Sequence, residues 1–424
     1  MARSPEKLRA KDIHVLKKPR LRIALFGAGG FGASHLEAIE QLEAEDLMEL
    51  VAVADPFVEQ LAEVKTRLEQ RGVRWFADFN DLLSSVSDRL DAVAIAAPIP
   101  WHLPMLSAAL DRGLAVYLEK PPIPLLQDFS KITSRPESQR VAVGFHLIAD
   151  PALWRLKRAM REGAFGRIVR ISASACWPRF TSYYKRAGWA GRMWWRDMPV
   201  FDGPATNALA HVVHHLMFLG GETEEAFAVP EEMQGEVYRA REMESYDLCG
   251  MAGSWASGIR FHLALSHAAR LRDNWEIVVH GEKGEARLFD SGKSFTSPVE
   301  LAEPLVPSPV ELVREACWRN FHSFATGAIA KPFTALSDCR AYVASTNAML
   351  LSSGGIHELP AEVCQTFEVD ENAGIAVDGV NELVQSVHEG KLFSELSLPW
   401  AVSGGAVNAR ALRSIPFVDL AARR

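Results

Sequence analysis

The sequence predicts an α/β fold, in which a doubly wound parallel sheet is followed by an α+β domain with a largely antiparallel, open sheet. From residue 21 to about 150, short runs that are apolar throughout alternate with helical patterns, as strands covered on both faces require. After Pro151 the strands alternate apolar and polar residues, which is typical of a sheet with one wet face. We divide the chain into an N-terminal arm, a first domain, a second domain and a C-terminal extension, at residues 1–20, 21–150, 151–360 and 361–424.

The first apolar run, Ile23–Phe26, ends in a glycine turn of the pattern G-x-G-x-x-G, and residues with helical spacing follow it. Gly27 lets the chain turn with no Cβ in the way, Gly29 lets the backbone approach a pyrophosphate, and Gly32 lets the helix pack on the strand. The N-terminus of that helix offers unpaired N–H groups and a positive dipole to the phosphates. This pattern is typical of a Rossmann domain that binds a dinucleotide.

A second buried strand, Leu50–Ala54, is followed by Asp55, about twenty residues beyond the last glycine of the turn. A carboxylate at this place accepts hydrogen bonds from both ribose hydroxyls of the cofactor and repels a 2′-phosphate. The sequence therefore favours NAD(H) over NADP(H). The cofactor contacts that we expect in this part of the chain are Gly27, Gly29, Gly30, Phe31, Gly32 and Asp55.

Three more apolar runs continue the predicted parallel sheet: Asp91–Ala97, Leu114–Leu118 and Val141–Phe145. Ligands of such sheets bind beyond the carboxyl ends of the strands, so the residues that follow these runs are candidates for the site. We expect cofactor contacts from Pro98, His102, Glu119 and Lys120, and a substrate contact from His146.

Lys120 stands in the sequence Glu119-Lys120-Pro121, directly after a predicted strand. Proline biases the residue before it away from the helical region, so the lysine side chain is expected to have a defined direction. Beside an oxidised nicotinamide, which is cationic, the pKa of this amine falls. Lys120 can then donate a hydrogen bond to a substrate hydroxyl or carbonyl. The alternative is a surface lysine in a proline-rich turn.

The elements predicted for the second domain are a helix over 154–162, strands over 167–171, 258–266, 275–280 and 285–289, a hairpin turn at 281–284, a loop over 303–310, and helices over 311–328 and 336–352. The last 60 or so residues include the apolar stretch Phe393–Trp400. Such a stretch is too apolar to be free in water, so we expect the extension to pack on the core or on a neighbouring subunit.

The segment Trp177–Phe201 combines aromatic and basic residues and holds four of the eleven tryptophans. Sugars present flat C–H faces to aromatic rings and hydroxyls to charged groups, so the segment suits a carbohydrate, including an acidic or phosphorylated one. From it we expect substrate contacts from Tyr183, Tyr184, Lys185, Arg192 and Trp195. The alternative is a subunit interface, where Trp, Tyr and Arg are likewise enriched.

Composition limits the possible partners. The 424 residues are 48% apolar with a net charge of −7, so there is no basic surplus of the kind that nucleic acid needs. The five cysteines are scattered and form no C-x-x-C pair, which indicates neither a zinc knuckle nor a disulfide frame. Residues 1–20 are basic but lack the apolar core of a signal peptide, and no apolar run approaches membrane-spanning length. We therefore expect a soluble cytoplasmic protein, with no nucleic-acid or membrane partner.

Several motifs resemble the Gfo/Idh/MocA family, named for glucose-fructose oxidoreductase and inositol dehydrogenase. They are the glycine turn, Ala97–His102, Glu119–Pro121, Val143–His146, Gly203–His211 and Glu276–Gly284. The resemblance covers about residues 20 to 360. It implies a Rossmann domain followed by a domain with an open antiparallel sheet, and NAD(P)-dependent oxidation or reduction of sugars and cyclitols. It also implies that Lys120 is the catalytic lysine of the E-K-P motif and His211 the catalytic histidine.

The chain departs from that family at the histidine. Asn207 stands where many members carry Asp, four residues before His211, and Leu209 stands where many carry Gly. In the V-G-[FY]-N stretch, His146 replaces the Asn. Because Asn207 carries no carboxylate, a mechanism that relies on a carboxylate beside the histidine is in doubt for this chain.

Asn207 and His211 lie four apart in the stretch 205–219, which Gly220 and Gly221 close. On a helix they would share one face, one turn apart. A histidine can take a hydroxyl proton as hydride leaves and return it in the reverse direction. Asn207 can hold the imidazole or a substrate hydroxyl but cannot stabilise imidazolium by charge, so we expect a lower pKa for His211 than an Asp neighbour would give. The candidate catalytic residues are Lys120, His211 and Asn207.

His211 and His215 are also spaced as zinc ligands on a helix, at i and i+4. No third ligand is apparent from the sequence. We expect His214 and His215 to pack beneath the sheet and predict no metal site.

The sequence thus predicts an oligomeric, dimeric or tetrameric, NAD(H)-dependent oxidoreductase that acts on a secondary hydroxyl or ketone of a sugar, a sugar derivative or a cyclitol. Two alternatives stay open. One is an NAD-dependent glycoside hydrolase that uses transient oxidation. The other is a non-catalytic protein that senses NAD or a sugar.

Overall fold

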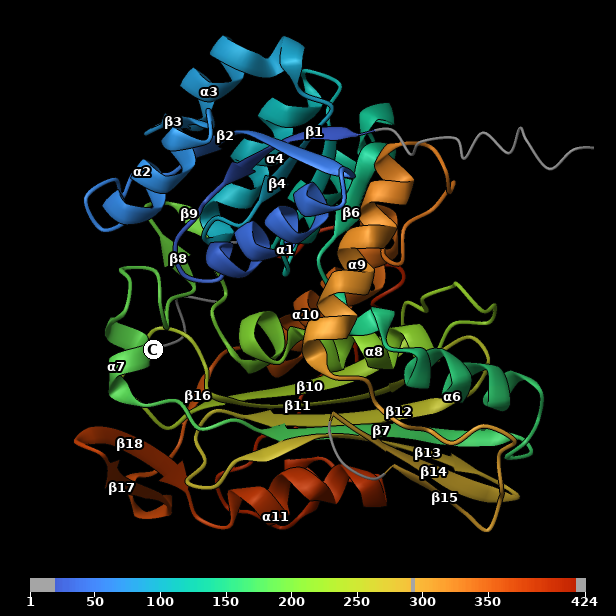
Figure 1. The fold of residues 1–424 in the computed structure, drawn as a ribbon. Coiled ribbons are helices and arrows are strands. Elements are labelled where there is room, and N and C mark those ends of the chain that lie inside the picture. Colours follow the sequence, from blue (N-terminus) through green and yellow to red (C-terminus); the bar gives the residue numbers. More distant parts are fainter. Residues whose placement is uncertain (1–19, 291–293, 417–424) are drawn as a thin grey trace, which may run out of the picture.

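The first domain is a six-stranded parallel sheet with helices on both faces (Figure 1). The computed structural model describes residues 20–290 and 294–416. The strands are β1 (Leu21–Phe26), β2 (Met48–Ala54), β3 (Arg74–Phe76), β4 (Ala92–Ile95), β5 (Ala115–Leu118) and β6 (Val141–Val143), in the order β3-β2-β1-β4-β5-β6. The strand order reverses between β1 and β4, which is where ligands bind in sheets of this type. The predicted Rossmann sheet is confirmed.

The strands of this sheet are buried on both faces. In β1, Ile23 and Leu25 belong to one apolar cluster, and Ala24 and Phe26 to another on the opposite face. The covering helices are α1 (Gly32–Ala44), α2 (Ala62–Gln70), α3 (Phe79–Val86), α4 (His102–Leu110) and α5 (Leu126–Thr133). This two-sided burial explains why the strands read as continuous apolar runs rather than alternating ones.

The second domain contains an eight-stranded, mostly antiparallel sheet. Its strands are β7 (Ile168–Cys176), β10 (Glu232–Arg239), β11 (Leu248–Ser254), β12 (Arg260–Ser266), β13 (Asp273–Gly281), β14 (Gly284–Phe289), β15 (Phe295–Ser297) and β16 (His357–Glu358), in the order β15-β14-β13-β7-β12-β11-β10-β16. Only the pairs β7–β12 and β10–β16 are parallel within the described residues. The predicted open antiparallel sheet is confirmed, with these two parallel pairs added.

The inner face of this sheet carries α6 (Pro151–Arg161), α8 (Ala210–Leu219) and α10 (Arg340–Ser353), and α9 (Val310–Ala325) runs from the sheet to the first domain (Figure 1). Trp318 of α9 stacks on Tyr117 of β5, with ring centroids 4.4 Å apart and planes 10° apart. Because both side chains are buried, this contact joins the two domains through one apolar cluster. The relative position of the two domains is therefore fixed by packing.

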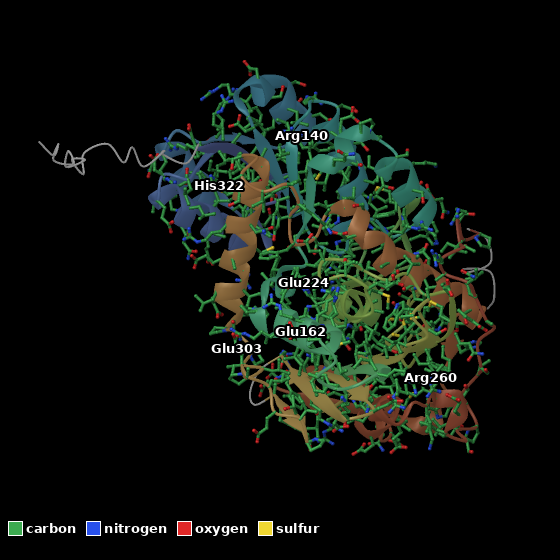
Figure 2. All side chains as sticks on the ribbon, turned by 90° about the vertical axis from the view of Figure 1, so that its right-hand side faces the viewer. Arg140, Glu162, Glu224, Arg260, Glu303 and His322 are labelled. Atoms are coloured by element: carbon green, nitrogen blue, oxygen red, sulfur yellow. The ribbon has the colours of Figure 1, made fainter. Side chains whose placement is uncertain are left out.

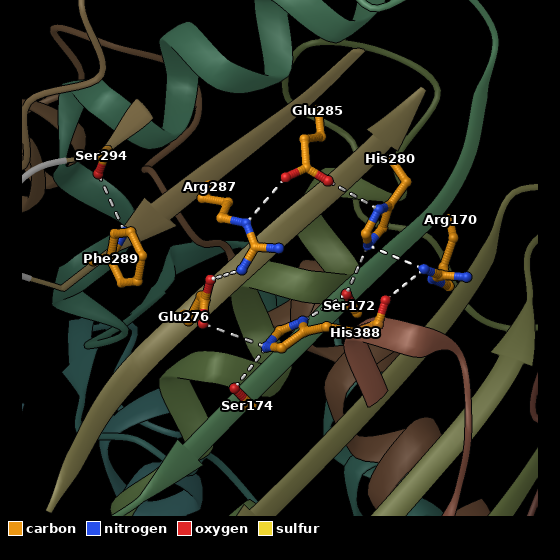
Figure 3. Close-up of polar contacts among 10 residues, drawn as sticks. All are labelled: Arg170, Ser172, Ser174, Glu276, His280, Glu285, Arg287, Phe289, Ser294 and His388. Carbon is orange, nitrogen blue, oxygen red and sulfur yellow. Dashed lines mark hydrogen bonds and ion pairs between the residues drawn. The ribbon is translucent and has the colours of Figure 1, made fainter. Parts of the chain in front are cut away.

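The C-terminal extension packs on the outer face of the second sheet. It forms β17 (Cys364–Val369), β18 (Asn372–Val377) and α11 (Val380–Gln385), whose apolar residues share a cluster with residues of β7, β10, β11 and β12. Figure 3 shows that His388 lies between two serines of β7: its Nδ1 is 2.8 Å from Ser172 Oγ and its Nε2 is 2.8 Å from Ser174 Oγ. The extension contacts the core of its own chain, which is one of the two arrangements that its composition predicted.

Among the described residues, no helix combines the length and the apolar character that crossing a bilayer requires.

Candidate active site

A cleft of about 1040 Å³ opens between the two domains. One wall is formed by the glycine turn and by the loops that follow β4, β5 and β6. The other wall is formed by the segment after β7, the residues before α8, the start of β13 and the loop before α9. The predicted site residues that line the cleft are Gly29, Gly30, Phe31, Pro98, His102, Glu119, Lys120, His146, Tyr183, Asn207 and His211.

The glycine turn has the shape that its sequence predicts. Gly27 has a φ of +88°, and a Cβ there would lie 2.8 Å from the carbonyl oxygen of Ala96. A Cβ at Gly32 would lie 2.2 Å from the carbonyl oxygen of Gly27, so no side chain fits where the helix meets the strand. Gly30 has a φ of +55° and has no atom within 4 Å of the place of its Cβ. The turn is therefore open on the side of the cleft.

The first N–H groups of α1 bond only backbone oxygens of the turn before it among the described residues: Gly32 to Gly29 at 2.9 Å, Ala33 to Gly30 at 3.3 Å and Ser34 to Phe31 at 3.1 Å. No side chain caps this helix, and its first turn holds no acidic residue. The first N–H groups of a helix have no partner within the helix itself, so an uncapped N-terminus attracts an anion such as a phosphate. With the open space at Gly30, these residues fit the pyrophosphate of a dinucleotide.

The carboxylate of Asp55 accepts hydrogen bonds from the backbone of the glycine turn. Its Oδ2 accepts hydrogen bonds from the N–H groups of Ala28, at 2.8 Å, and Gly29, at 3.2 Å, and its Oδ1 accepts one from Phe57, at 2.9 Å. The carboxylate is buried and does not line the cleft. These backbone groups are its hydrogen-bond partners among the described residues, and the contact with ribose expected from the sequence stays a prediction.

Two buried side chains organise the loops after β4 and β5. The Oε1 of Glu119 lies 3.1 Å from Nε2 of His35. Burial raises the pKa of the Glu119 carboxyl, but His35, Lys120 and His146 together lower it by more, and the net shift is downward. His102 lies between the two loops, with its Nδ1 2.8 Å from the Pro121 oxygen and its Nε2 2.8 Å from the Ala97 oxygen. His102 thus positions the backbone around the cleft as well as lining it.

Lys120 extends from the first domain to the second. Its Nζ donates a hydrogen bond of 3.0 Å to the backbone oxygen of Asn207. Burial lowers the pKa of this amine from its ordinary 10.5, Glu119 opposes the shift, and Arg179 adds to it. The side chain therefore has a fixed direction and a weakened hold on its proton.

The prediction that Asn207 and His211 occupy one continuous helix is wrong. Residues Pro204–Ala208 form a π-helical turn, and α8 begins only at Ala210. The N–H of Leu209 bonds the oxygen of Pro204, five residues back, at 2.9 Å. In this wider turn Nδ2 of Asn207 donates to Oδ1 of Asp202 at 2.6 Å, and the imidazole of His211 receives no hydrogen bond from it.

His211 is buried at the bottom of the cleft, and neither ring nitrogen has a hydrogen-bond partner among the described residues. The ring of His146 meets it edge to face, with centroids 4.5 Å apart. Burial lowers the pKa of His211 well below 6.5, and His146 and Lys120 lower it further. Burial also lowers the pKa of His146 to about 4. Both imidazoles are therefore neutral at physiological pH.

The other two histidines of α8 pack against aromatic rings. His214 stacks on Phe145 with centroids 4.0 Å apart, and His215 meets Trp275 edge to face at 5.4 Å. Neither histidine lines the cleft.

The aromatic and basic segment contributes different residues from those expected. Tyr183 lines the cleft, but Tyr184, Lys185, Arg192 and Trp195 do not. The helix α7 (Thr181–Lys185) is a single turn, on which neighbouring side chains point in different directions, so only one of the two tyrosines faces the cleft. Tyr184 instead lies beneath the guanidinium of Arg241, and the Trp195 ring lies beneath Arg196.

Several lining residues were not singled out from the sequence. They are Trp177, Arg179, Arg186, Trp189, Arg272, Asn274, Trp275 and Asp290. The first four stand within the aromatic and basic segment, whose composition pointed to them without separating them from their neighbours. The last four lie at the ends of β13 and β14, far along the chain and outside any motif. The pairing of β13 with β7, and of β14 with β13, brings them to the cleft.

Two family models match the chain. One, described as an oxidoreductase family with an NAD-binding Rossmann fold, matches residues 21–146, and the other, a GFO/IDH/MocA C-terminal domain, matches residues 153–287. Among curated proteins, inositol 2-dehydrogenase 4 of Saccharopolyspora erythraea is 34% identical over 174 residues, which are 38% of this chain and 48% of that protein. The rhizopine catabolism protein MocA of Rhizobium meliloti is 28% identical over 155 residues, 36% of this chain and 46% of that protein. The chain thus spans about half the length of the curated relatives it matches.

Solved structures share the fold. The WlbA dehydrogenase of Bordetella pertussis, in complex with NADH and UDP-GlcNAcA, is 24% identical with a TM-score of 0.66, over 79% of this chain and 97% of that one. A myo-inositol dehydrogenase of Corynebacterium glutamicum is 19% identical with a TM-score of 0.60, over the same shares.

Proposed function

The chain belongs to the Gfo/Idh/MocA family of NAD-binding oxidoreductases, and we propose that it transfers hydride between NAD(H) and a secondary hydroxyl or ketone of a sugar, a sugar derivative or a cyclitol. One observation carries this proposal. Lys120, from the end of β5, and His211, from α8, line the same cleft as the glycine turn. A proton donor or acceptor and a hydrogen-bond donor thus face the space next to the expected cofactor site. Inositol dehydrogenases among the relatives support a cyclitol or sugar as the substrate.

The glycine turn is the proposed site of the cofactor's pyrophosphate. Gly29, Gly30 and Phe31 line the cleft there, beside the uncapped N-terminus of α1. NAD, when bound, supplies the position that accepts or donates the hydride. We assign to Asp55 the preference for NAD(H) over NADP(H), because a buried carboxylate beside the turn repels a 2′-phosphate.

Lys120 is the proposed hydrogen-bond donor to the reacting oxygen. Its amine is already oriented by the Asn207 carbonyl, 3.0 Å away, so a substrate oxygen in the cleft meets a donor that needs little rearrangement. Such a donor polarises a ketone for reduction and stabilises the developing oxyanion during oxidation.

His211 is the proposed proton acceptor in oxidation and donor in reduction. Its imidazole is neutral, and its ring nitrogens have no partner among the described residues, so one of them is available to a substrate hydroxyl. Asn207 acts through its backbone, as the acceptor that orients Lys120. Its amide donates to Asp202 and makes no hydrogen bond with the imidazole.

The two alternatives left open by the sequence have no support in these observations. The relatives reported above are dehydrogenases and a catabolic protein, and none is a glycoside hydrolase or a sensor. A test on the protein itself separates the three functions.

The purified protein should be incubated with NAD⁺ and a panel of sugars, sugar acids, cyclitols and glycosides, with NADH followed by absorbance and free aglycone by chromatography. Net NADH formed in proportion to an oxidised free sugar or cyclitol is the expected result. Release of an aglycone without net NADH would assign a glycoside hydrolase. Tight binding of NAD with no turnover of any compound would assign a sensor.

A further inference from the structure

The wall of the cleft in the second domain carries guanidinium groups that alternate with aromatic rings. The Cζ atoms of Arg272 and Arg179 lie 4.4 Å and 5.8 Å from the centroid of the Trp177 ring. This arrangement follows from the sheet, because Cys176 of β7 pairs with Asp273 of β13. The residue after Cys176 and the residue before Asp273 are therefore neighbours across the two strands.

The alternation continues through the next aromatic side chains. The ring of Tyr183 lies 4.5 Å from Cζ of Arg179 and 3.5 Å from Cζ of Arg186. Arg186 in turn lies 4.7 Å from the ring of Trp189. A guanidinium that stacks on a ring keeps its N–H edge free, and the stacking fixes the plane of that edge. Stacking therefore orients the guanidinium groups without using their N–H donors. Of these donors, Nη1 of Arg186 bonds the Tyr183 oxygen at 2.6 Å and Nε of Arg272 bonds Oδ1 of Asn274 at 3.0 Å.

The positive charge of this wall is only partly neutralised by carboxylates of the described residues. Among the described residues, no carboxylate lies within 4.0 Å of Arg179 or Arg272, and the one nearest to Arg186, Asp202, is 3.7 Å away and already accepts from Gly191 and Asn207. The cleft lining holds four cationic side chains, Lys120 and the three arginines, against two carboxylates, Glu119 and Asp290. The lining of the cleft therefore has an excess of positive charge, and its three arginines all lie in the second domain.

Arg179 also has an unused buried donor. Its Nε–H has no hydrogen-bond partner among the described residues. A buried donor that stays unpaired is costly, so such a group normally bonds water or a ligand. A carboxylate or a phosphate group matches the paired N–H groups of a guanidinium in geometry and charge.

This cluster lies on the substrate side rather than the pyrophosphate side of the cleft. It belongs to the second domain, whereas the glycine turn belongs to the first. The charges of Arg179 and Arg186 both lower the pKa of Lys120, so they lie near the amine that is proposed to meet the reacting oxygen. An anionic group held here would sit on the same molecule as that oxygen.

We propose that Arg179 and Arg186, with Arg272 beside them, form an anion subsite, and that the substrate is a carbohydrate carrying a carboxylate or a phosphate group. The inference rests on the proposed function and specifies its substrate class. The aromatic rings between the arginines offer apolar faces to the sugar ring, and the guanidinium edges receive the anion.

Matched pairs of compounds test the proposal. Glucose should be compared with glucuronate and with glucose 6-phosphate, and myo-inositol with its monophosphate, by kcat/KM for NAD⁺ reduction. The carboxylate and phosphate arms tell the two kinds of anion apart. The variants are Arg179→Gln and Arg186→Gln. The control is Arg140→Gln, since Arg140 is exposed in the first domain and does not line the cleft (Figure 2).

At least one anionic compound should exceed its neutral partner. Either substitution in the subsite should lower kcat/KM for the anionic compound about 10- to 100-fold, the range expected for a charged hydrogen bond, while the neutral partner and the control change by about twofold or less. The proposal is overturned if neutral and anionic partners react equally and lose activity equally in the variants. It is also overturned if the variants weaken NADH binding as much as sugar binding, because the arginines would then serve the cofactor.

If no compound is oxidised, the anion subsite can still be tested by measuring binding. In that case the proposed function fails, and calorimetry of the NADH-loaded protein with the same pairs decides the subsite. Tighter binding of the anionic partner, lost in Arg179→Gln, supports it. Equal binding of both partners, or tighter binding that persists in the variant, overturns it.

Discussion

The Nζ of Lys120 lies 3.0 Å from the backbone oxygen of Asn207, and this hydrogen bond spans the cleft between the two domains. The lysine comes from the end of β5, and the carbonyl belongs to the π-helical turn before α8. Since α9 also fixes the two domains through the stacked rings of Tyr117 and Trp318, the amine is held where it can meet a substrate oxygen.

Lys120→Ala should remove most of the activity. Loss of the donor to the reacting oxygen should lower kcat about 10²- to 10⁴-fold, while the Kd for NADH stays within about threefold. Steady-state rates and NADH fluorescence titration measure the two effects. Lys131→Ala is the control, because Lys131 is on the surface, with 78% of its side chain exposed. An unchanged kcat in Lys120→Ala would remove the lysine from the proposed mechanism.

The pH dependence of sugar oxidation should reflect the two lowered pKa values. His211 must be neutral to accept a proton, and burial lowers its pKa well below 6.5, so the rate should stay level as pH falls through 6.5. Lys120 must be protonated to donate, and its pKa is lowered from 10.5, so the alkaline loss should begin below that pH. Profiles of kcat/KM against pH measure both limbs. An acid limb centred at 6.5 or above would contradict the neutral, buried imidazole.

Asn207→Asp, which restores the residue common in the family, should destabilise this chain. The Asn207 amide now donates to Asp202 at 2.6 Å, and an aspartate there would place two carboxylates together. The expected loss is about 1–3 kcal/mol in the free energy of unfolding at neutral pH. The repulsion raises the pKa of one carboxyl, so the loss should shrink as pH falls through that raised value.

Urea denaturation measures this effect. The double variant Asp202→Asn with Asn207→Asp reverses the two partners and should recover much of the stability. If Asn207→Asp alone is as stable as wild type at neutral pH, the contact with Asp202 is not the reason for the asparagine.

Asp55 should contribute separately to the glycine turn and to cofactor choice. Asp55→Ala leaves the N–H groups of Ala28 and Gly29 without their acceptor, and the expected loss is about 1–3 kcal/mol in unfolding free energy. Both Asp55→Ala and Asp55→Asn remove the negative charge and should raise the affinity for NADPH relative to NADH by about tenfold or more. Only Asp55→Asn keeps a side-chain oxygen for the turn, so it should be the more stable of the two. An unchanged preference for NADH in both variants would mean that another residue selects the cofactor.

Local sequence was enough to predict the elements whose own residues show a recognisable pattern. Gly27 and Gly32 are needed because a Cβ at either position would clash with backbone, so the turn could be predicted from the glycines alone. The buried strands β1, β2 and β4 could be predicted because each contains an uninterrupted apolar run: Ile23–Phe26, Leu50–Ala54 and Ala92–Ile95. The strand β3 (Arg74–Phe76) was missed, since three residues are too few to show a period.

The strands β10 and β11 were missed because glycines interrupt their alternation. Tertiary packing requires glycine at these positions. A Cβ at Gly235 would clash with the backbone of Met349, and one at Gly253 would clash with the oxygen of Glu232. The π-helical turn was missed for a similar reason. The Tyr342 hydroxyl donates to the Ala205 oxygen of this turn at 3.0 Å. The two residues are 137 positions apart, so local sequence does not show this contact.

The residues of the candidate site likewise fall into those that local sequence predicts and those that only the tertiary fold places there. Lys120 and His211 stand in motifs, and both line the cleft. Arg272 and Asp290 stand in no motif and reach the cleft through the position of β13 and β14 in the sheet. Which tyrosine of the pair Tyr183 and Tyr184 faces the cleft depends on the start of a one-turn helix, and composition does not fix that point.

Transfer of deuterium from substrate to cofactor tests the central claim most directly. The purified protein should be incubated with NAD⁺ and the perdeuterated form of any sugar or cyclitol that reacts in the panel, and the nicotinamide product should be examined by mass spectrometry and NMR. We expect NADH that carries one deuterium at the C4 position of its ring, formed by the wild type and not by Lys120→Ala. Product that forms with unlabelled NADH, or with no NADH at all, would contradict hydride transfer in this cleft.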